Sequence, residues 1–327
     1  MPVTINMVNL SLKEVLIILN QVKTFTNRKL VIIIAALCCF LWGSAFPAVK
    51  MGYKLFNISN SNIPSELLFA GYRFTLAGVI VLIVSALSGN NIFKLSKKDT
   101  VDLLLLGITQ TTLQYIFFYI GLANTTGVKG SIMNSMATFF SVILAHFIYA
   151  DDKLNLNKII GCILGFIGVI IINFNADLLS FSFNLFGDVF IVIAAFIFSV
   201  GSIYSKKLTK NLNVTAVTGY NLFIGGIILI LIGIISGGRV SNFTISSSFL
   251  LIYMAIISSA AFSLWTLLLK YNKVGTVSIF NFLTPIFGAI LSSIFLGENI
   301  LEFKNIFALS LVCLGIWNVY KPYWGRF

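Results

Sequence analysis

Three polar residues within one apolar stretch are the first whose types and spacing suggest chemistry. Gln110 and Gln114 are four positions apart and therefore share one face of a helix, and Tyr115 follows directly. Amide and phenol groups bind polar solutes through hydrogen bonds. Because ligand sites are mostly apolar with a few placed polar groups, we predict that these three residues line a substrate-binding site.

Arg73 is the most informative charged residue, because it lies inside an apolar segment about two turns beyond Glu66. A charge at the centre of a membrane helix costs about 2.5–3.5 kcal/mol on insertion scales, so Arg73 should face the protein interior or a water-filled path. We predict that it contacts a substrate carboxylate. The alternatives are snorkelling to the membrane surface and a structural salt bridge, for which Glu66 on the same face is a candidate partner.

Two tryptophans and two prolines lie in other apolar stretches. Trp42 and Trp265 are candidates for the aromatic walls of the substrate site, and the alternative is packing or an interfacial aromatic belt. Pro47 and Pro285 each remove a backbone hydrogen bond and tend to kink a helix. We predict hinges at both prolines, with a static bend as the alternative.

The residues that enzymes use are largely missing. The single histidine, His146, excludes a His-pair metal site, and no HExxH or GxSxG motif occurs. No glycine is followed by lysine, so there is no P-loop and no sign of an ATP-driven pump. We therefore predict a protein that is not an enzyme and holds no cofactor and no metal. The four cysteines lie in apolar stretches and are interpreted as packing residues (Cys38, Cys39, Cys162 and Cys313).

The composition shows what kind of protein positions these residues. Of the 327 residues, 58% are hydrophobic and only 10% are charged, and the mean hydropathy is +0.99. A soluble domain has about 25% charged residues, so a water-soluble fold is excluded, and the high hydrophobicity excludes disorder. The natural solvent of this chain is a lipid bilayer.

Ten long charge-free windows predict ten transmembrane helices in an all-α integral membrane protein. A helix needs about 20 mostly apolar residues to cross the bilayer, and the shorter windows reach this length with flanking residues. The windows are 30–49, 74–93, 103–128, 130–150, 159–176, 189–205, 211–238, 240–269, 274–297 and 305–320.

The net charge of +12 follows membrane topology, and we predict no nucleic-acid partner. With a cytoplasmic N-terminus, 16 of the 22 Lys and Arg residues fall on the inner side, five fall outside, and Arg73 lies within a helix. This excess obeys the positive-inside rule and places both termini in the cytoplasm. We predict a multi-pass protein of the plasma (inner) membrane, with a cytoplasmic arm at 1–29 and a tail at 321–327, and a monomeric state is compatible with the sequence.

The second half of the chain repeats the first. A shift of 148 positions aligns Gly71-Tyr72 with Gly219-Tyr220, and a shift of 147 aligns Ser131-Ile132 with Ser278-Ile279. Each repeat, 30–176 and 177–320, contains five helices. Because five is odd, the second copy enters the membrane from the opposite side, which makes an inverted repeat typical of secondary transporters. The alternative is a duplication kept only for packing.

The repeat also pairs Asn134 with Asn281. Buried amides in lipid need partners, so we predict that both asparagines face a central substrate site, with helix-to-helix hydrogen bonding as the alternative. Thr138 stands where the second repeat has Pro285, so we expect less bending in the first copy of this helix.

Several short motifs resemble the drug/metabolite transporter superfamily in its ten-helix EamA branch. They are Trp42 to Pro47, Tyr72 to Phe74, Phe118 to Ile132, Gly187 to Lys207, and Thr284 to Glu298. The resemblance implies export or exchange of small metabolites, with amino acids prominent among known substrates. We predict a secondary transporter of small polar metabolites, with export favoured over import. The alternatives are a binding or signalling protein on the same scaffold and a polytopic lipid-modifying enzyme.

Overall fold

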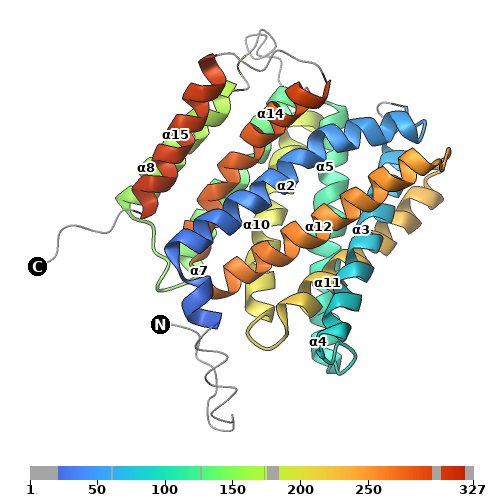
Figure 1. Ribbon diagram of the computed structural model, residues 1–327, viewed down its shortest axis with the longest axis horizontal. Coiled ribbons are helices and arrows are strands. Elements are labelled where there is room, and N and C mark those ends of the chain that lie inside the picture. Colours follow the sequence, from blue (N-terminus) through green and yellow to red (C-terminus); the bar gives the residue numbers. More distant parts are fainter. Residues whose placement is uncertain are drawn as a thin grey trace, which may run out of the picture.

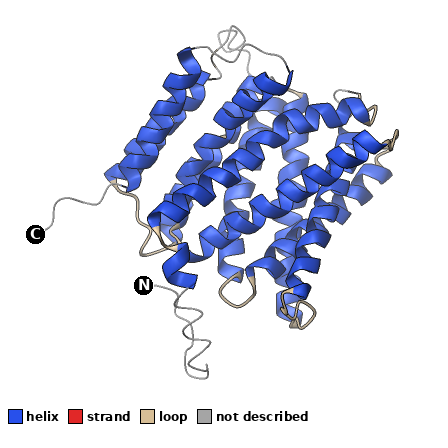
Figure 2. Ribbon diagram, in the orientation of Figure 1, coloured by secondary structure: helices blue, strands red, loops and turns tan. Residues whose placement is uncertain are grey.

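The computed structural model describes residues 21–59, 62–125, 127–172, 174, 184–296 and 303–320. All regular secondary structure in these ranges is helical, as Figure 2 shows. Most of the predicted N-terminal arm, residues 1–20, and the whole predicted tail, 321–327, lie outside the described residues.

The helices form ten membrane-crossing segments that coincide with the ten predicted windows. Seven helices are long and apolar enough to cross a membrane, and three shorter apolar helices complete the set. In chain order the segments are α2 (Arg28–Leu55), α3 (Ile63–Leu87), α4–η2–α5 (Lys97–Leu106, Gly107–Leu113, Gln114–Ala123), α6–α7 (Gly127–Asn134, Met136–Ile148), α8 (Leu156–Ile172), η3–α10 (Leu185–Val189, Phe190–Leu208), α11 (Val214–Ile235), α12 (Ile245–Tyr271), α13–η4–α14 (Val274–Ser278, Ile279–Phe282, Leu283–Leu296) and α15 (Phe303–Tyr320).

Side chains at loop residues fix where several helices begin. The Asn27 side chain accepts a hydrogen bond from the backbone N–H of Lys29 at 3.0 Å, at the start of α2. Ser96 and Thr244 form capping boxes at α4 and α12. Such caps satisfy backbone donors that the first helical turn leaves free, so the helix ends lie where the polar sequence places them.

The first and last described segments start and end at the same face of the molecule. The guanidinium carbon of Arg28 lies 5.3 Å from the ring centre of Tyr320. We call this the terminal face. The loop between α11 and α12 meets the end of α2 at the other side, where the Asn242 side chain donates to the Leu55 carbonyl at 2.7 Å, and we call this the opposite face.

Two pairs of equivalent helices, one from each repeat, pack against each other in antiparallel fashion. Helix α3 packs along α11, and α8 lies beside α15 at one edge of the bundle (Figure 1). A methyl group on Gly78 would collide with the Phe223 nitrogen, and one on Gly226 would collide with the Thr75 nitrogen. The repeat shift that aligns Gly71 with Gly219 exchanges these two contacts, so the α3–α11 contact has the two-fold symmetry of an inverted repeat.

The α8–α15 contact follows the same symmetry. Gly161 approaches the carbonyl of Gly315, and Gly168 approaches that of Ala308, and the repeat shift exchanges these two contacts. Glycines at these positions let the helix backbones come close together, as expected for helix contacts in membranes. Gly161 and Gly168 therefore serve close packing of α8 against α15.

The fourth and ninth segments both break near their middle. Helix α6 ends at Asn134 and α7 begins at Met136, while the 3₁₀ turn η4 separates α13 from α14. The first copy, with Thr138, is interrupted at Ser135 alone, and the second, with Pro285, by the 3₁₀ turn η4, so the expectation of less bending in the first copy stays a prediction. The Ser135 hydroxyl donates to the Ile132 carbonyl at 2.6 Å, and side-chain bonds of this kind bend helices without a proline.

Candidate functional site

Arg73 is a deeply buried cation at mid-depth of the bundle. Only 4% of its surface is exposed. Its Nε donates to the Ser258 hydroxyl of α12 at 2.8 Å, and the guanidinium carbon lies 4.7 Å from the ring centre of Phe74. The bond to Ser258 uses Nε alone, so the two terminal nitrogens can donate to another group. Snorkelling to the surface does not occur.

Aromatic side chains surround this guanidinium. The centres of the Phe74 and Tyr115 rings lie 4.4 Å apart, and Arg73 acts electrostatically on Tyr115 and Tyr119 of α5. Glu66, which is also buried, acts on Tyr119 as well, so one carboxylate lies in the same region. The arrangement offers a cationic donor with aromatic walls, which fits a ligand that has a carboxylate and an apolar part.

Trp42 and Trp265 extend this aromatic wall along the bundle. The Trp42 ring centre lies 5.1 Å from that of Trp265 and 5.5 Å from that of Phe262, and Phe262 lies 6.3 Å from Phe74. Trp265 is 2% exposed, which excludes an interfacial position. Its indole N–H and the Gln114 carbonyl oxygen are both buried without a hydrogen-bond partner among the described residues. Both groups are therefore suited to bind a ligand.

Gln110 occupies a different environment, inside the π-helix η2. Its carbonyl oxygen accepts from the Asn221 amide of α11 at 3.0 Å, and its own amide points to the Ser202 hydroxyl of α10 at 3.5 Å. The Asn221 carbonyl oxygen accepts from the Thr111 hydroxyl at 3.0 Å. All four residues are at most 4% exposed, so this buried network ties three helical segments together.

The Arg73 and Asn221 contacts are repeat equivalents of each other. A shift of 148 positions carries Arg73 onto Asn221, and a shift of 147 carries Thr111 onto Ser258. The bonds Arg73–Ser258 and Asn221–Thr111 therefore occupy matching places in the two halves. Sequence reasoning missed Asn221, Thr111 and Ser258, although the repeat shift itself was the signal that pointed to them.

The paired asparagines lie at the helix breaks. Asn134 ends α6, Asn281 lies in η4, and both are half-buried. No side-chain hydrogen bond of either is found within the described part of the chain. The freed backbone carbonyls nearby are bonded instead by other side chains, with Thr138 donating to Ser278 at 3.3 Å and Cys39 to Phe280 at 3.1 Å.

The two predicted hinge prolines differ in context. Pro47 lies within the continuous helix α2, whereas Pro285 lies in the first turn of α14, just after the 3₁₀ turn η4. Only Pro285 therefore accompanies a break in its segment. Both remain predicted hinges.

A hydrogen bond at the terminal face also joins the two repeats. Asp152, in the turn after α7, is 1% exposed and forms an ion pair with Lys158 at 2.5 Å. Its other carboxylate oxygen accepts from the backbone N–H of Gly275 at 2.8 Å, which links the first repeat to the start of α13. Burial, together with the nearby Asp152 and Asp151, raises the pKa of the Tyr149 hydroxyl to about 12, so Tyr149 stays protonated here.

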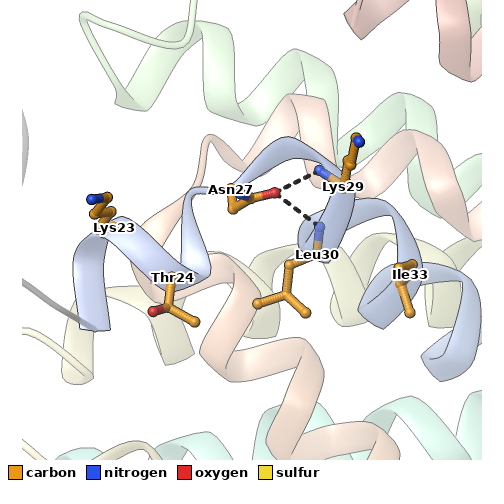
Figure 3. Close-up of a pocket in the computed structure, with 6 residues that line it drawn as sticks. All are labelled: Lys23, Thr24, Asn27, Lys29, Leu30 and Ile33. Carbon is orange, nitrogen blue, oxygen red and sulfur yellow. Dashed lines mark hydrogen bonds between the residues drawn. The ribbon is translucent and has the colours of Figure 1, made fainter.

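Two shallow hollows lie on the surface, away from the predicted site residues. One, at the start of α2, is lined by Lys23, Thr24, Asn27, Lys29, Leu30 and Ile33 (Figure 3). The other is lined by residues of the loop before α12 and its first turns, from Phe243 to Ile252. Among the described residues, no three His, Cys, Asp or Glu side chains lie close enough together to hold a metal ion.

Ten apolar segments in two inverted repeats, with buried polar groups at mid-depth, define a multi-pass membrane protein of the transporter type. The sequence profile of the EamA-like transporter family matches residues 29–174 and 185–321, one match to each repeat. The chain therefore belongs to the EamA-like transporter family. This membership places it in a lipid bilayer with a small-molecule substrate.

Similar proteins agree with this assignment. An uncharacterized transporter of Archaeoglobus fulgidus is 27% identical over 270 residues, which cover 82% of this chain and 89% of that protein. The uncharacterized transporter YetK of Bacillus subtilis is 26% identical over 257 residues, or 76% of each chain. A protein of known crystal structure matches with a TM-score of 0.75 at 16% identity, covering 90% of this chain and 97% of its own, which supports the fold.

Proposed function

We propose that this chain is a secondary transporter that exports small carboxylate-bearing metabolites, such as amino acids, by alternating access. The observation that supports this most is the Arg73 guanidinium, which is 4% exposed, donates through its Nε to Ser258 and lies over the ring of Phe74. A planar guanidinium matches a carboxylate in two-point contact, which supports a carboxylate ligand at this residue.

Other groups predicted to line the site match the rest of an amino acid. The unpartnered Gln114 carbonyl oxygen is an acceptor for an ammonium group, and the rings of Phe74, Tyr115 and Trp42 offer apolar surface. We assign substrate contacts to Arg73, Gln114, Tyr115, Trp42 and Trp265, and give Asn134 and Asn281 the same role at the helix breaks.

We further propose that the terminal face is cytoplasmic and that the membrane is the plasma membrane. The positive-inside excess supports the first point, with the arm at 1–29 and the short tail at 321–327 on that side of repeats 30–176 and 177–320. Because every assigned group comes from one chain, a monomer suffices. Neither an enzymatic reaction nor a nucleic-acid partner is part of the proposal.

The experiment is flux in reconstituted vesicles. A thermal-shift screen of purified protein against a metabolite library selects ligands, and the best amino acid is then loaded into vesicles in radiolabelled form. We expect counterflow with that amino acid and none with its decarboxylated amine, because the amine has no anion for Arg73. Equal transport of both would contradict the proposal, as would ligand binding without flux.

A further inference from the structure

The two halves of the molecule are tied unequally at their matching polar contacts. On the side of the opposite face, the Nε of Arg73 bonds to Ser258. Towards the terminal face, Asn221 uses both ends of its amide, one with Thr111 and one with Gln110. The residue equivalent to Gln110 in the other half is Ile257, which is 5% exposed and has no hydrogen-bonding side chain.

This additional bond joins the two repeats at mid-depth. Gln110 belongs to the first repeat, while Asn221 and Ser202 belong to the second. Asn221 lies seven positions from the terminal-face end of α11, which is about 10 Å into the bundle from that face. Arg73 lies ten positions from the other end of its helix, the opposite-face end of α3. The network therefore lies between the Arg73 site and the terminal face.

A second contact between the repeats lies in the same direction. Asp152 of the first repeat accepts from the Gly275 N–H of the second at the terminal face itself. Each of these contacts joins one repeat to the other, and alternating access moves the two repeats relative to each other.

We propose that Gln110 and Asn221 form a gate that separates the Arg73 site from the terminal face and opens when the protein changes state. This inference rests on the proposed function and reassigns Gln110 from substrate contact to gate. The pair is neutral, so it opens without separating charges. The position of Gln110 in the π-helix η2 fits this role, since π-turns are frequent at functional sites.

Thiol labelling tests the gate without requiring transport. A cysteine-free background carries Ser258→Cys, which places a thiol beside Arg73, and a membrane-impermeant thiol reagent is added from each side of oriented vesicles. We expect Asn221→Ala and Gln110→Ala each to raise the labelling rate from the terminal face at least tenfold. The double variant should add little, because both changes break the same Gln110–Asn221 bond. Labelling from the opposite face should not rise.

The matched control is Thr218→Ala, one turn from Asn221 on α11. Thr218 is 1% exposed and its hydroxyl has no partner among the described residues, so its loss removes a buried polar atom without breaking the network. Its labelling rate should equal that of the Ser258→Cys parent. Unchanged labelling in both gate variants would overturn the proposal, and so would an equal rise from both faces, which would indicate general loosening.

Melting temperatures in detergent show whether each variant is folded before its labelling rate is compared. If Asn221→Ala inserts poorly, Asn221→Thr, which retains a polar group but cannot bond Gln110 and Thr111 together, replaces it with the same expected rise. Because the assay detects access rather than flux, absence of transport would contradict the proposed function while the labelling rates still decide the gate.

Discussion

The contact Arg73–Ser258 and its repeat equivalent Asn221–Thr111 use the same backbone positions for different chemistry. In one half the side chain is a cation beside aromatic rings that spends one donor on its partner, and in the other it is an amide whose two ends are both bonded. The inverted repeat places both contacts at matching backbone positions, and the residue types at those positions differ between the two halves. The half with the cation is suited to binding, and the half with the satisfied amide is suited to closing the path.

Breaking the buried Asp152–Lys158 ion pair at the terminal face should have the largest effect on stability. Asp152→Asn leaves Lys158 buried without its counter-charge, and removing one partner of a buried ion pair costs about 3–5 kcal/mol. Asp151→Asn, at the exposed neighbouring carboxylate, is the control and should change little. Thermal unfolding in detergent measures both, and similar melting temperatures for the two variants would show that the buried pair does not stabilise the fold.

Removing the Arg73 cation should lower transport of carboxylate substrates. Arg73→Gln should lower carboxylate transport about tenfold to a hundredfold, because hydrogen bonds to charged groups contribute about 1.5–3 kcal/mol. Arg73→Lys should retain part of the activity. Flux is compared at equal amounts of inserted protein, and an unchanged rate for Arg73→Gln would assign Arg73 a structural role only.

The glycine contact between α3 and α11 should respond symmetrically. Gly78→Ala and Gly226→Ala each press a methyl group against a backbone nitrogen, and such overpacking costs about 1–3 kcal/mol. Because the two positions are repeat equivalents, their losses of stability should agree within error. The exposed apolar position Leu231 supplies the control change Leu231→Ala, and clearly different losses at the two glycines would argue against a symmetric contact.

The smallest effects are expected at the hydroxyl partners. Ser258→Ala and Thr111→Val each remove one buried side-chain hydrogen bond between segments, and such bonds contribute about 0.6 kcal/mol on average in membrane proteins. Ser258→Ala should raise the KM for substrate about threefold, because Ser258 orients Arg73. Thr111→Val should leave KM unchanged, and a matching rise there would place substrate at both contacts.

The sequence alone predicted much of this architecture. All ten segments follow from charge-free windows, and inversion follows from an odd number of helices in each repeat. Both rest on the bilayer, which demands long apolar helices and leaves little choice of secondary structure. Arg73 was also identifiable, because a charge in an apolar helix is expensive wherever it lies.

The sequence did not predict how side chains pair across the bundle. The partners Ser258 and Asn221 lie 185 and 111 residues from Arg73 and Gln110, and nothing local marks them. The break in the fourth segment was likewise missed, because Ser135 bends the helix through its own side chain without the proline that sequence rules look for.

The number of helices and the inversion of the repeats were therefore determined by sequence. Both depend on the free energy of transfer of each segment into lipid, which is a sum over the residues of that segment alone. The different hydrogen-bond partners of the matching positions in the two halves were decided by tertiary structure. Whether Gln110 meets an amide and Arg73 meets a hydroxyl depends on helix rotation and packing, which arise between segments and leave no trace in the hydropathy of any one of them.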